Sequence, residues 1–516
     1  MSEQGKLNIL LYSRCNLVHL HGQISKHLEK EYNVIHLAYS EDQELILRDK
    51  YGVTNILRYC HEYSDIKKTE QFDPDLCATL DKQIAQYTDG EFSLNSAIQS
   101  DRTFSGKPYL HCLIESQIFY KTWAKLFDAY DIDVLIHEAN SLLMNQMASV
   151  VAKERGSHYF TFIQVRGFDK YSWLLVDAAN GTSPEICRMI NKTNLDNSEH
   201  IVSSYKRLFM TPNDLNGIFH NRKVKHPAEF AWHAMLSSTK AMVRSIQKCL
   251  KTTQKGISDI EDFLSKRPTV FSSILKEYFY SYKVRYDALD RQDKYYFYPI
   301  HIEPEAVVLY WAGGWYKNQI KLVENISAQL PAHTWLYVKD HPYSLSYRSI
   351  GDYHRLRAIP NVKLIDPRTN SIEIIKNSTG VITINGTSGF EALVLGKAVY
   401  TFGSIYYNCC SNVTHVRHIK NLGSIISDKE SNWEQNKDKR EQELAKFVSA
   451  FIKSIHPGFI AFFSNYAEKA NIDLSCNAEI VADGFVKAIR VIYDSEYEII
   501  MKKGKTTAIS DGILSS

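Results

Sequence analysis

The sequence predicts an α/β protein built from two doubly wound domains that face a cleft, with a helical connector between them and helices at the C-terminal end. Apolar runs typical of buried parallel strands alternate with amphipathic helical stretches in two separate blocks of the chain. Between the blocks lie long helical segments without a strand candidate. The 516 residues suffice for two or three domains with sizeable cores.

Composition and charge exclude several classes of protein. The chain is 44% hydrophobic, 12% aromatic and 23% charged, as folded globular proteins are. A net charge of +3 is far below that of a typical nucleic-acid-binding protein, so no nucleic-acid partner is expected. The apolar run near the N-terminus is short, and no stretch reaches the roughly 18 apolar residues of a membrane span. These features predict a cytoplasmic protein and leave a peripheral membrane contact open.

The cysteines give no sign of a metal site. The nine cysteines form no C-x-x-C pair and have no zinc-like spacing with histidine. We therefore expect reduced thiols and no bound metal.

The alternation divides the chain into five segments. The first domain is predicted over 1–235, with strands at 7–13, 33–39, 133–139 and 158–165 and helices at 20–32, 113–130 and 141–156. A helical connector is expected over 236–290. The second domain is predicted over 291–430, where the alternation begins at "YYFYPIHI" (295–302) and apolar strand-like runs at 306–314, 334–342, 361–367, 380–386 and 398–404 alternate with helices at 316–331, 370–378 and 388–396. Helices over 431–500 are expected to pack back on the domains, and 501–516 to form a frayed tail.

Two such Rossmann-like domains bind ligands beyond the carboxyl ends of their strands, so functional residues are expected there. His341 follows a predicted strand directly, and Pro342 restricts the preceding residue to an extended conformation. An imidazole held in this way can donate a hydrogen bond to a phosphate oxygen, and Lys339 adds positive charge beside it. The alternative is that His341 bonds a neighbouring loop and Pro342 merely stops the strand.

A glycine-punctuated turn between a predicted strand and a helix forms a second candidate site, at Gly386, Thr387, Ser388 and Gly389. The glycines allow close approach of a ligand, and the helix N-terminus offers amides to an anion. The turn is neither a Walker loop nor a G-x-G-x-x-G motif. Ser388 and Glu391 also fit an ordinary S-x-x-E capping box, which would occupy the same amides. Gly313 is a further candidate for contact with a nucleotide.

A resemblance adds to these motifs. The runs "YFYPIHIEPEAVVLYWAGGWYKNQ", "LPAHTWLYVKDHPY" and "VITINGTSGFEALVLGKAVYTFGSIYY" resemble the capsule polysaccharide synthesis family, which includes bacterial Kdo transferases with a GT-B fold. The resemblance covers roughly 295–425, about a quarter of the chain. It implies a GT-B-like arrangement of the two domains. It also implies that His341 and the pair Thr387 and Ser388 hold the phosphate of a CMP-activated sugar, and that Glu391 holds the ribose.

Glycosyl transfer also needs a carboxylate, either as general base or as nucleophile, and in a GT-B arrangement it should come from strand ends of the first domain. The candidate carboxylates are Glu138, which ends a predicted strand, and Asp169; the basic Arg14, after the first strand, is a candidate for substrate binding. As an alternative, Glu138 is an acid favoured at a helix start. Arg166 can pair with a sugar or acceptor carboxylate, or can be a solvated surface charge. The acidic motif of the Kdo transferases is only loosely matched by "QVRGFDKY".

The resemblance implies a metal-independent glycosyltransferase that moves a CMP-activated ulosonic acid, such as Kdo or a sialic acid relative, to a capsule or lipopolysaccharide glycan. Its partners would be the nucleotide-sugar donor and a glycan or glycolipid acceptor, with inner-membrane or capsule-assembly contacts left open. No cofactor beyond the donor is expected. The alternatives are a GT-B transferase or epimerase that uses a UDP- or GDP-sugar, and a non-catalytic capsule-assembly partner.

Overall fold

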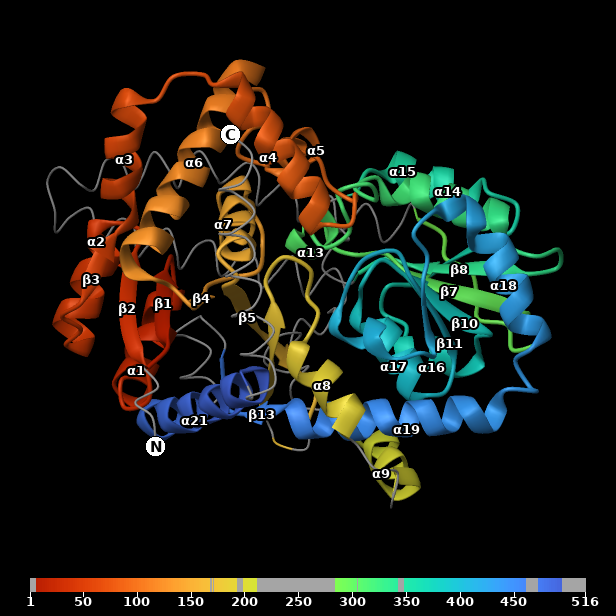
Figure 1. Ribbon diagram of the computed structural model, residues 1–516. Helices are drawn as coiled ribbons and strands as arrows, with labels where there is room; N and C mark the ends of the chain where they lie inside the picture. Colours follow the sequence, from red (N-terminus) through yellow and green to blue (C-terminus); the bar gives the residue numbers. More distant parts are fainter. Residues whose placement is uncertain are drawn as a thin grey trace, which may run out of the picture.

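The computed structural model describes residues 6–167, 169, 171–192, 198–210, 284–303, 305–341, 348–460 and 472–493. Within these ranges two parallel-rich sheets lie side by side, each covered by helices (Figure 1). Most of the predicted connector at 236–290 and the predicted tail at 501–516 fall outside the described residues.

The first sheet has the strand order β13-β6-β5-β4-β1-β2-β3. Its strands are β1 (Asn8–Ser13), β2 (Asn33–Ala38), β3 (Ile56–Arg58), β4 (Val134–Ile136), β5 (His158–Val165), β6 (Ser172–Asp177) and β13 (His456–Pro457). β1 to β5 pair in parallel, whereas β6 and β13 pair antiparallel at one edge. The central strand β1 is buried along nearly its whole length, which explains why it reads as a continuous apolar run.

The second sheet has the strand order β12-β11-β10-β7-β8-β9, and all of its described pairings are parallel. Its strands are β7 (Tyr295–Pro299), β8 (Trp335–Lys339), β9 (Val362–Ile365), β10 (Gly380–Thr383), β11 (Ala398–Thr401) and β12 (Val413–His415). In each sheet the chain adds the second and third strands on one side of the first strand, and then adds the next three on the other side. The order reverses between β1 and β4 in one sheet and between β7 and β10 in the other, and ligands bind at such switch points in doubly wound folds.

Helices cover the two sheets. On the first sheet they are α1 (Leu17–Leu28), α2 (Glu41–Leu45), which continues as a π-helical turn (Ile46–Lys50), α3 (Tyr59–Thr69), α4 (Pro74–Tyr87), α5 (Leu94–Ser100), α6 (Tyr109–Tyr130), α7 (Leu143–Glu154) and α8 (Pro184–Lys192). On the second they are α13 (Ala306–Leu309), α14 (Gln319–Gln329), α15 (Ile350–Arg357), α16 (Ser371–Asn377), α17 (Thr387–Val394) and α18 (Leu422–Ser431), with 3-10 turns at Tyr406–Cys409 and Ile419–Asn421. Helix α9 (Ser198–Met210), which follows α8, packs instead against α17 and α19 (Lys437–Ser454).

The chain returns to the first domain after completing the second. The long helix α19 (Lys437–Ser454) runs beneath the second domain as far as α8, and α21 (Leu474–Ile492) lies against the first domain (Figure 1). Apolar side chains of α21, among them Val481 and Phe485, share a core with β1 and β4. The C-terminal helices therefore contribute to the stability of the first domain.

The structure corrects one prediction and adds the strands β3, β6, β12 and β13. The apolar run 306–314 is not a strand, because α13 and a turn with two glycines at positive φ occupy it. The first strand of the second sheet is β7, in the run "YYFYPIHI" that opens the second alternating block. The antiparallel strands β6 and β13 were not predicted, because β13 is only two residues long and belongs to the C-terminal part of the chain.

Aromatic residues of the 306–314 region and of the turn after it reach across to the first domain. The Trp311 indole donates a hydrogen bond to the Ala178 carbonyl at 2.9 Å, and the Trp315 indole donates one to the Glu91 carbonyl, also at 2.9 Å. The Tyr310 ring is stacked with Phe92 at a centroid distance of 6.0 Å. The segment from Tyr310 to Trp315 is therefore a bridge between the two domains.

Candidate functional site

The switch point of the second sheet brings a histidine against the glycine turn. His301 lies just beyond the carboxyl end of β7 and is buried, with Nε2 3.3 Å from the Thr383 hydroxyl at the end of β10. A Cβ at position 386 would lie 3.1 Å from the imidazole Cε1, which explains why Gly386 stands there. His301 was not among the predicted site residues, although it follows a strand end as His341 does and the same reasoning applies to it.

Helix α17 starts at this turn without the capping box that the sequence offered as an alternative to anion binding. The helix begins at Thr387 with Gly386 at the N-cap position, and no side chain caps it. Ser388 is therefore inside the helix, and the box with Glu391 does not form. The first amides of α17 keep hydrogen-bonding capacity for an anion. Packing within the protein explains the glycine at position 389, since a Cβ there would lie 2.5 Å from the Tyr407 hydroxyl.

A buried ion pair stabilises the chain at the carboxyl end of β8. Asp340 is fully buried and accepts hydrogen bonds from Arg348 Nε at 3.0 Å and from the Tyr353 hydroxyl at 2.6 Å. Arg348 also donates to Glu303 at 2.9 Å and to the His301 carbonyl at 2.9 Å. Arg348 thus ties the ends of β7 and β8 together.

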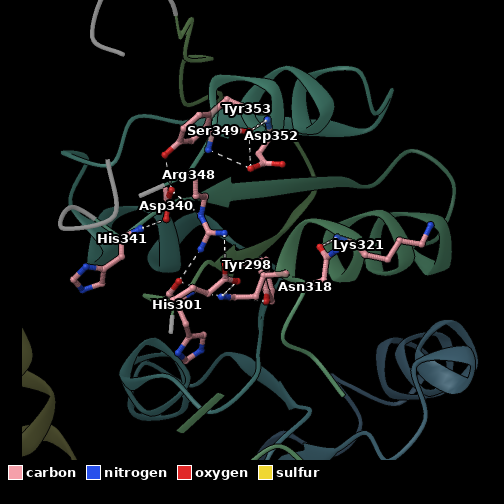
Figure 2. Close-up of polar contacts among 12 residues, drawn as sticks. Tyr298, His301, Asn318, Lys321, Asp340, His341, Arg348, Ser349, Asp352 and Tyr353 are labelled. Atoms are coloured by element: carbon pink, nitrogen blue, oxygen red, sulfur yellow. Dashed lines mark hydrogen bonds and ion pairs between the residues drawn. The ribbon is translucent and has the colours of Figure 1, made fainter. Parts of the chain in front are cut away.

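This arrangement orients His341, the residue predicted to bind a phosphate. The backbone N–H of His341 donates to the Asp340 carboxylate at 2.7 Å, and Figure 2 shows the His341 ring directed away from Arg348 and Asp340. The ion pair thus fixes the backbone of His341 and leaves the imidazole outside the buried network. Lys339, by contrast, is buried and donates to the Pro367 carbonyl at 3.3 Å.

Charged residues from both domains act on Glu391. Burial raises the pKa of Glu391 from 4.5 to about 7, against the opposing effects of Arg166 and Lys339. Arg166 follows the carboxyl end of β5 in the first domain, whereas Lys339 ends β8 in the second. The carboxyl ends of strands from the two sheets therefore approach each other around Glu391.

The raised pKa of Glu391 predicts a pH-dependent stability. Because the folded-state pKa lies above the unfolded value of about 4.5, the folded protein binds more protons between pH 4.5 and 7, and the free energy of unfolding falls as pH rises through this range. Glu391→Gln should flatten that slope. Thermal melts of both proteins from pH 5 to pH 8 measure the effect, and parallel curves would contradict it, since all other titrating groups are shared.

The switch point of the first sheet carries a carboxylate. Arg14 follows β1 and Glu138 follows β4, and the Arg14 guanidinium lies 3.1 Å from Glu138 Oε1. The same carboxylate accepts hydrogen bonds from the Ser141 hydroxyl at 3.0 Å and from the Asn145 amide at 3.4 Å. The Arg14 guanidinium also lies over the Tyr39 ring, at 5.6 Å from its centroid. Two of the predicted residues thus meet at a single site.

The surroundings of Glu138 favour its ionised form. Burial opposes ionisation, but the effects of His137, of Arg14 and of the hydrogen bonds from Ser141 and Asn145 leave its pKa below the ordinary value. Burial also lowers the pKa of His137 to about 4, so this imidazole is neutral near pH 7. Arg14 is therefore the positive charge beside Glu138 near pH 7, at 3.1 Å. An ionised carboxylate at a switch point can accept a proton or attack an electrophilic carbon.

Other predicted residues have different surroundings. Asp169 is exposed and follows β5 rather than a switch-point strand. Pro342 lies outside the described residues. Gly313 has a φ of +64°, and a Cβ there would lie 2.9 Å from Trp315 Cδ1 and 3.0 Å from the Glu91 carbonyl, so its role is to let the tryptophan approach the first domain. Arg348 and Tyr39 were not predicted as site residues.

Fold and site together define a protein of two Rossmann-like domains with a polar site at each switch point. Residues 271–422 match the family of capsule polysaccharide biosynthesis proteins, which confirms the resemblance predicted from the motifs of the second domain. The matched segment contains His301, His341, the glycine turn and Glu391.

The chain is also similar to individual proteins. It is 32% identical over 132 residues to Protein FixF of Sinorhizobium fredii, a match that covers 25% of this chain and 31% of that protein. The chain therefore spans about a third of the length of this curated relative. The KpsC β-Kdo 2,7 transferase of Thermosulfurimonas dismutans is 13% identical, with 69% of this chain and 89% of that one covered and a TM-score of 0.30. A UDP-GlcNAc 2-epimerase of Neisseria meningitidis, bound to UDP-GlcNAc, is 11% identical, with 87% and 99% covered and a TM-score of 0.23. The two-domain architecture follows from the strand order of this chain itself.

Metal-ligand clusters and membrane-spanning helices are both absent from the described residues. Among them, no group of three or more His, Cys, Asp and Glu side chains is arranged to hold a metal ion. In the same part of the chain, no helix has the length and apolar character needed to cross a bilayer.

Proposed function

We propose that this protein is a glycosyltransferase of capsule polysaccharide synthesis that uses a CMP-activated ulosonic acid as its donor. The observation that carries the proposal is that the segment matching the capsule family contains the switch point where His301 meets the uncapped start of α17. A nucleotide phosphate fits such a place, because imidazole N–H groups and helix amides are good donors to an anion. The acceptor would be a glycan or a glycolipid.

The transfer needs charge stabilisation at the donor and a proton acceptor at the acceptor. In an inverting transfer, an acceptor hydroxyl oxygen attacks the anomeric carbon, the bond from that carbon to a phosphate oxygen breaks, and CMP leaves with the electron pair. We assign the released hydroxyl proton to Glu138. His301, His341 and the first amides of α17 would counter the charge that develops on the phosphate.

The donor assignment is tested by ligand binding. CMP, UDP and GDP should be compared by thermal shift, because a ligand at 100 times its dissociation constant stabilises a protein by about 2.7 kcal/mol. We expect the largest shift with CMP. A shift with UDP and none with CMP would favour the alternative of a UDP-sugar transferase or epimerase.

His341→Ala should weaken CMP binding and slow transfer while the melting temperature stays close to that of the wild type. The reason is that the ring lies outside the Arg348 and Asp340 network, whereas the backbone N–H that bonds Asp340 is kept in alanine. We expect a loss of about tenfold in CMP affinity, the equivalent of one charge-assisted hydrogen bond of about 1.4 kcal/mol. A collapse of the melting temperature would show that the histidine is structural.

Transfer should also survive EDTA. In this proposal the charge on the leaving phosphate is met by imidazoles and helix amides, which need no divalent cation. The measurement compares initial rates of transfer before and after chelation, and then with added Mg²⁺ or Mn²⁺. A strict requirement for either cation would contradict the proposed stabilisation of the phosphate.

A further inference from the structure

Trp315 is an exposed aromatic residue with an ordered position. Its side chain is 73% exposed, more than any other large hydrophobic side chain in the described part of the chain. Its N–H is nevertheless held by the Glu91 carbonyl of the first domain at 2.9 Å. Two glycines at positive φ, Gly313 and Gly314, shape the turn, and a Cβ on Gly314 would lie 2.7 Å from the Ser100 hydroxyl. The indole is therefore fixed by its edge while most of its surface meets solvent.

The turn lies between the two switch points. On one side, Gln319 follows it and bonds both backbone groups of His301, with its Oε1 2.8 Å from the His301 N–H and its Nε2 3.1 Å from the carbonyl. On the other side, Gly314 touches Ser100. The adjacent Asp101 carboxylate accepts a hydrogen bond at 2.7 Å from the Leu143 amide at the start of α7, the helix that follows Glu138.

A lysine two residues after Trp315 has no partner among the described residues. Lys317 Cε lies 3.0 Å from the position of a Cβ on Gly314, and the side chain is half-buried. No hydrogen bond or ion pair joins its ammonium group to any side chain or carbonyl in the described ranges. Burial lowers its pKa, and no carboxylate opposes the shift. The neighbouring Glu91 carboxylate is instead close to His415, 3.5 Å from its Nε2. Lys317 can therefore accept an anionic partner from outside the chain.

We propose that Trp315 and Lys317 form a subsite for an acidic sugar of the acceptor glycan. The proposal rests on the glycosyltransferase function proposed above and names the class of its acceptor. One face of a pyranose ring carries mostly C–H groups, and these pack on the electron-rich face of an indole. The carboxylate of the same sugar, or of the next one, pairs with the Lys317 ammonium. The glycan would thus be held beside the donor site while its terminal hydroxyl reaches Glu138.

The test uses two trisaccharides of linked pyranoses, tri-galacturonate as the acidic probe and maltotriose as the neutral one. Binding is measured by saturation-transfer NMR in the absence of a donor. We expect the wild type to bind tri-galacturonate at millimolar concentration and at least about tenfold more tightly than maltotriose. Lys317→Gln should abolish the preference for the acidic probe. Trp315→Ala should weaken both probes about tenfold, and Trp315→Phe should retain part of the affinity.

Phe72→Ala is the matched control, because Phe72 is also exposed, at 42%, and lies before α4, away from the turn. It should bind both probes as the wild type does. Wild-type binding that is undetectable or equal for the two probes would overturn the proposal, as would unchanged binding by Trp315→Ala. Thermal shift with CMP on the same proteins separates the two proposals. If CMP causes no thermal shift in the wild type, the donor assignment alone is contradicted. If CMP causes the expected shift but the acidic probe does not bind, only the subsite is contradicted.

Discussion

Glu138→Gln is expected to bind CMP normally and to transfer sugar at least about a hundredfold more slowly, the lower range for general acid–base catalysis. Glutamine keeps the shape of the side chain and can still bond Ser141 and Asn145, so the fold should be unaffected. It cannot accept a proton from an acceptor hydroxyl or attack an anomeric carbon. The measurement is the single-turnover rate of transfer, compared with CMP affinity from the thermal shift.

Asp169→Asn is the matched control for this experiment. Asp169 was the rival candidate in the sequence, yet it is exposed and lies after β5, whereas Glu138 pairs with Arg14 at the switch point at 3.1 Å. We expect Asp169→Asn to remain active. If Asp169→Asn is inactive and Glu138→Gln is active, the role of carboxylate passes to Asp169, and the switch point would then bind the acceptor only.

The sequence predicts much of the site because strand ends can be recognised locally. Glu138 and His341 each end an apolar run, and in a parallel sheet the carboxyl ends of strands share one edge. The two-domain α/β fold follows from the same alternation of apolar runs and amphipathic helices. His301 is within reach of this reasoning, because it stands in the run "YYFYPIHI" that opens the second alternating block, but it is not among the predicted site residues.

Other features depend on contacts that no local pattern contains. The alternative of a capping box at Ser388 fits S-x-x-E, but the N-cap position is taken by Gly386, two residues earlier. Gly389 was expected to make room for a ligand, whereas the Tyr407 hydroxyl, from a distant turn, fills that room. The exposure of Trp315 depends on how the domains meet, since its N–H bonds a carbonyl more than two hundred residues earlier in the chain.

Arg348→Met is expected to have the largest effect on stability. The Arg348 side chain is 6% exposed and Asp340 is fully buried, so removal of the guanidinium strands a carboxylate in the core. Breaking a buried ion pair from one side typically costs about 3–5 kcal/mol, because the remaining charge keeps its desolvation penalty and loses its partner. We therefore expect a decrease of about that size in the free energy of unfolding of the second domain, measured by urea denaturation.

The pH dependence of the free energy of unfolding of Arg348→Met shows whether the unpaired Asp340 carboxylate causes the loss of stability. Burial already raises the pKa of Asp340, and Arg348 is the main opposing influence, so in Arg348→Met the folded-state pKa should rise further above its unfolded value. A carboxyl group of this kind favours the folded state when protonated, so the variant should lose more stability at pH 8 than at pH 5. Adding Asp340→Asn to Arg348→Met should recover much of the loss, since no buried charge is then left unpaired, and it should remove the extra pH dependence.

Equal losses at both pH values, with no recovery in the double variant, would mean that Arg348 stabilises the domain through its bonds to Glu303 and the His301 carbonyl rather than through Asp340. In either case CMP binding should weaken, because the ends of β7 and β8 that carry His301 and His341 are no longer tied together.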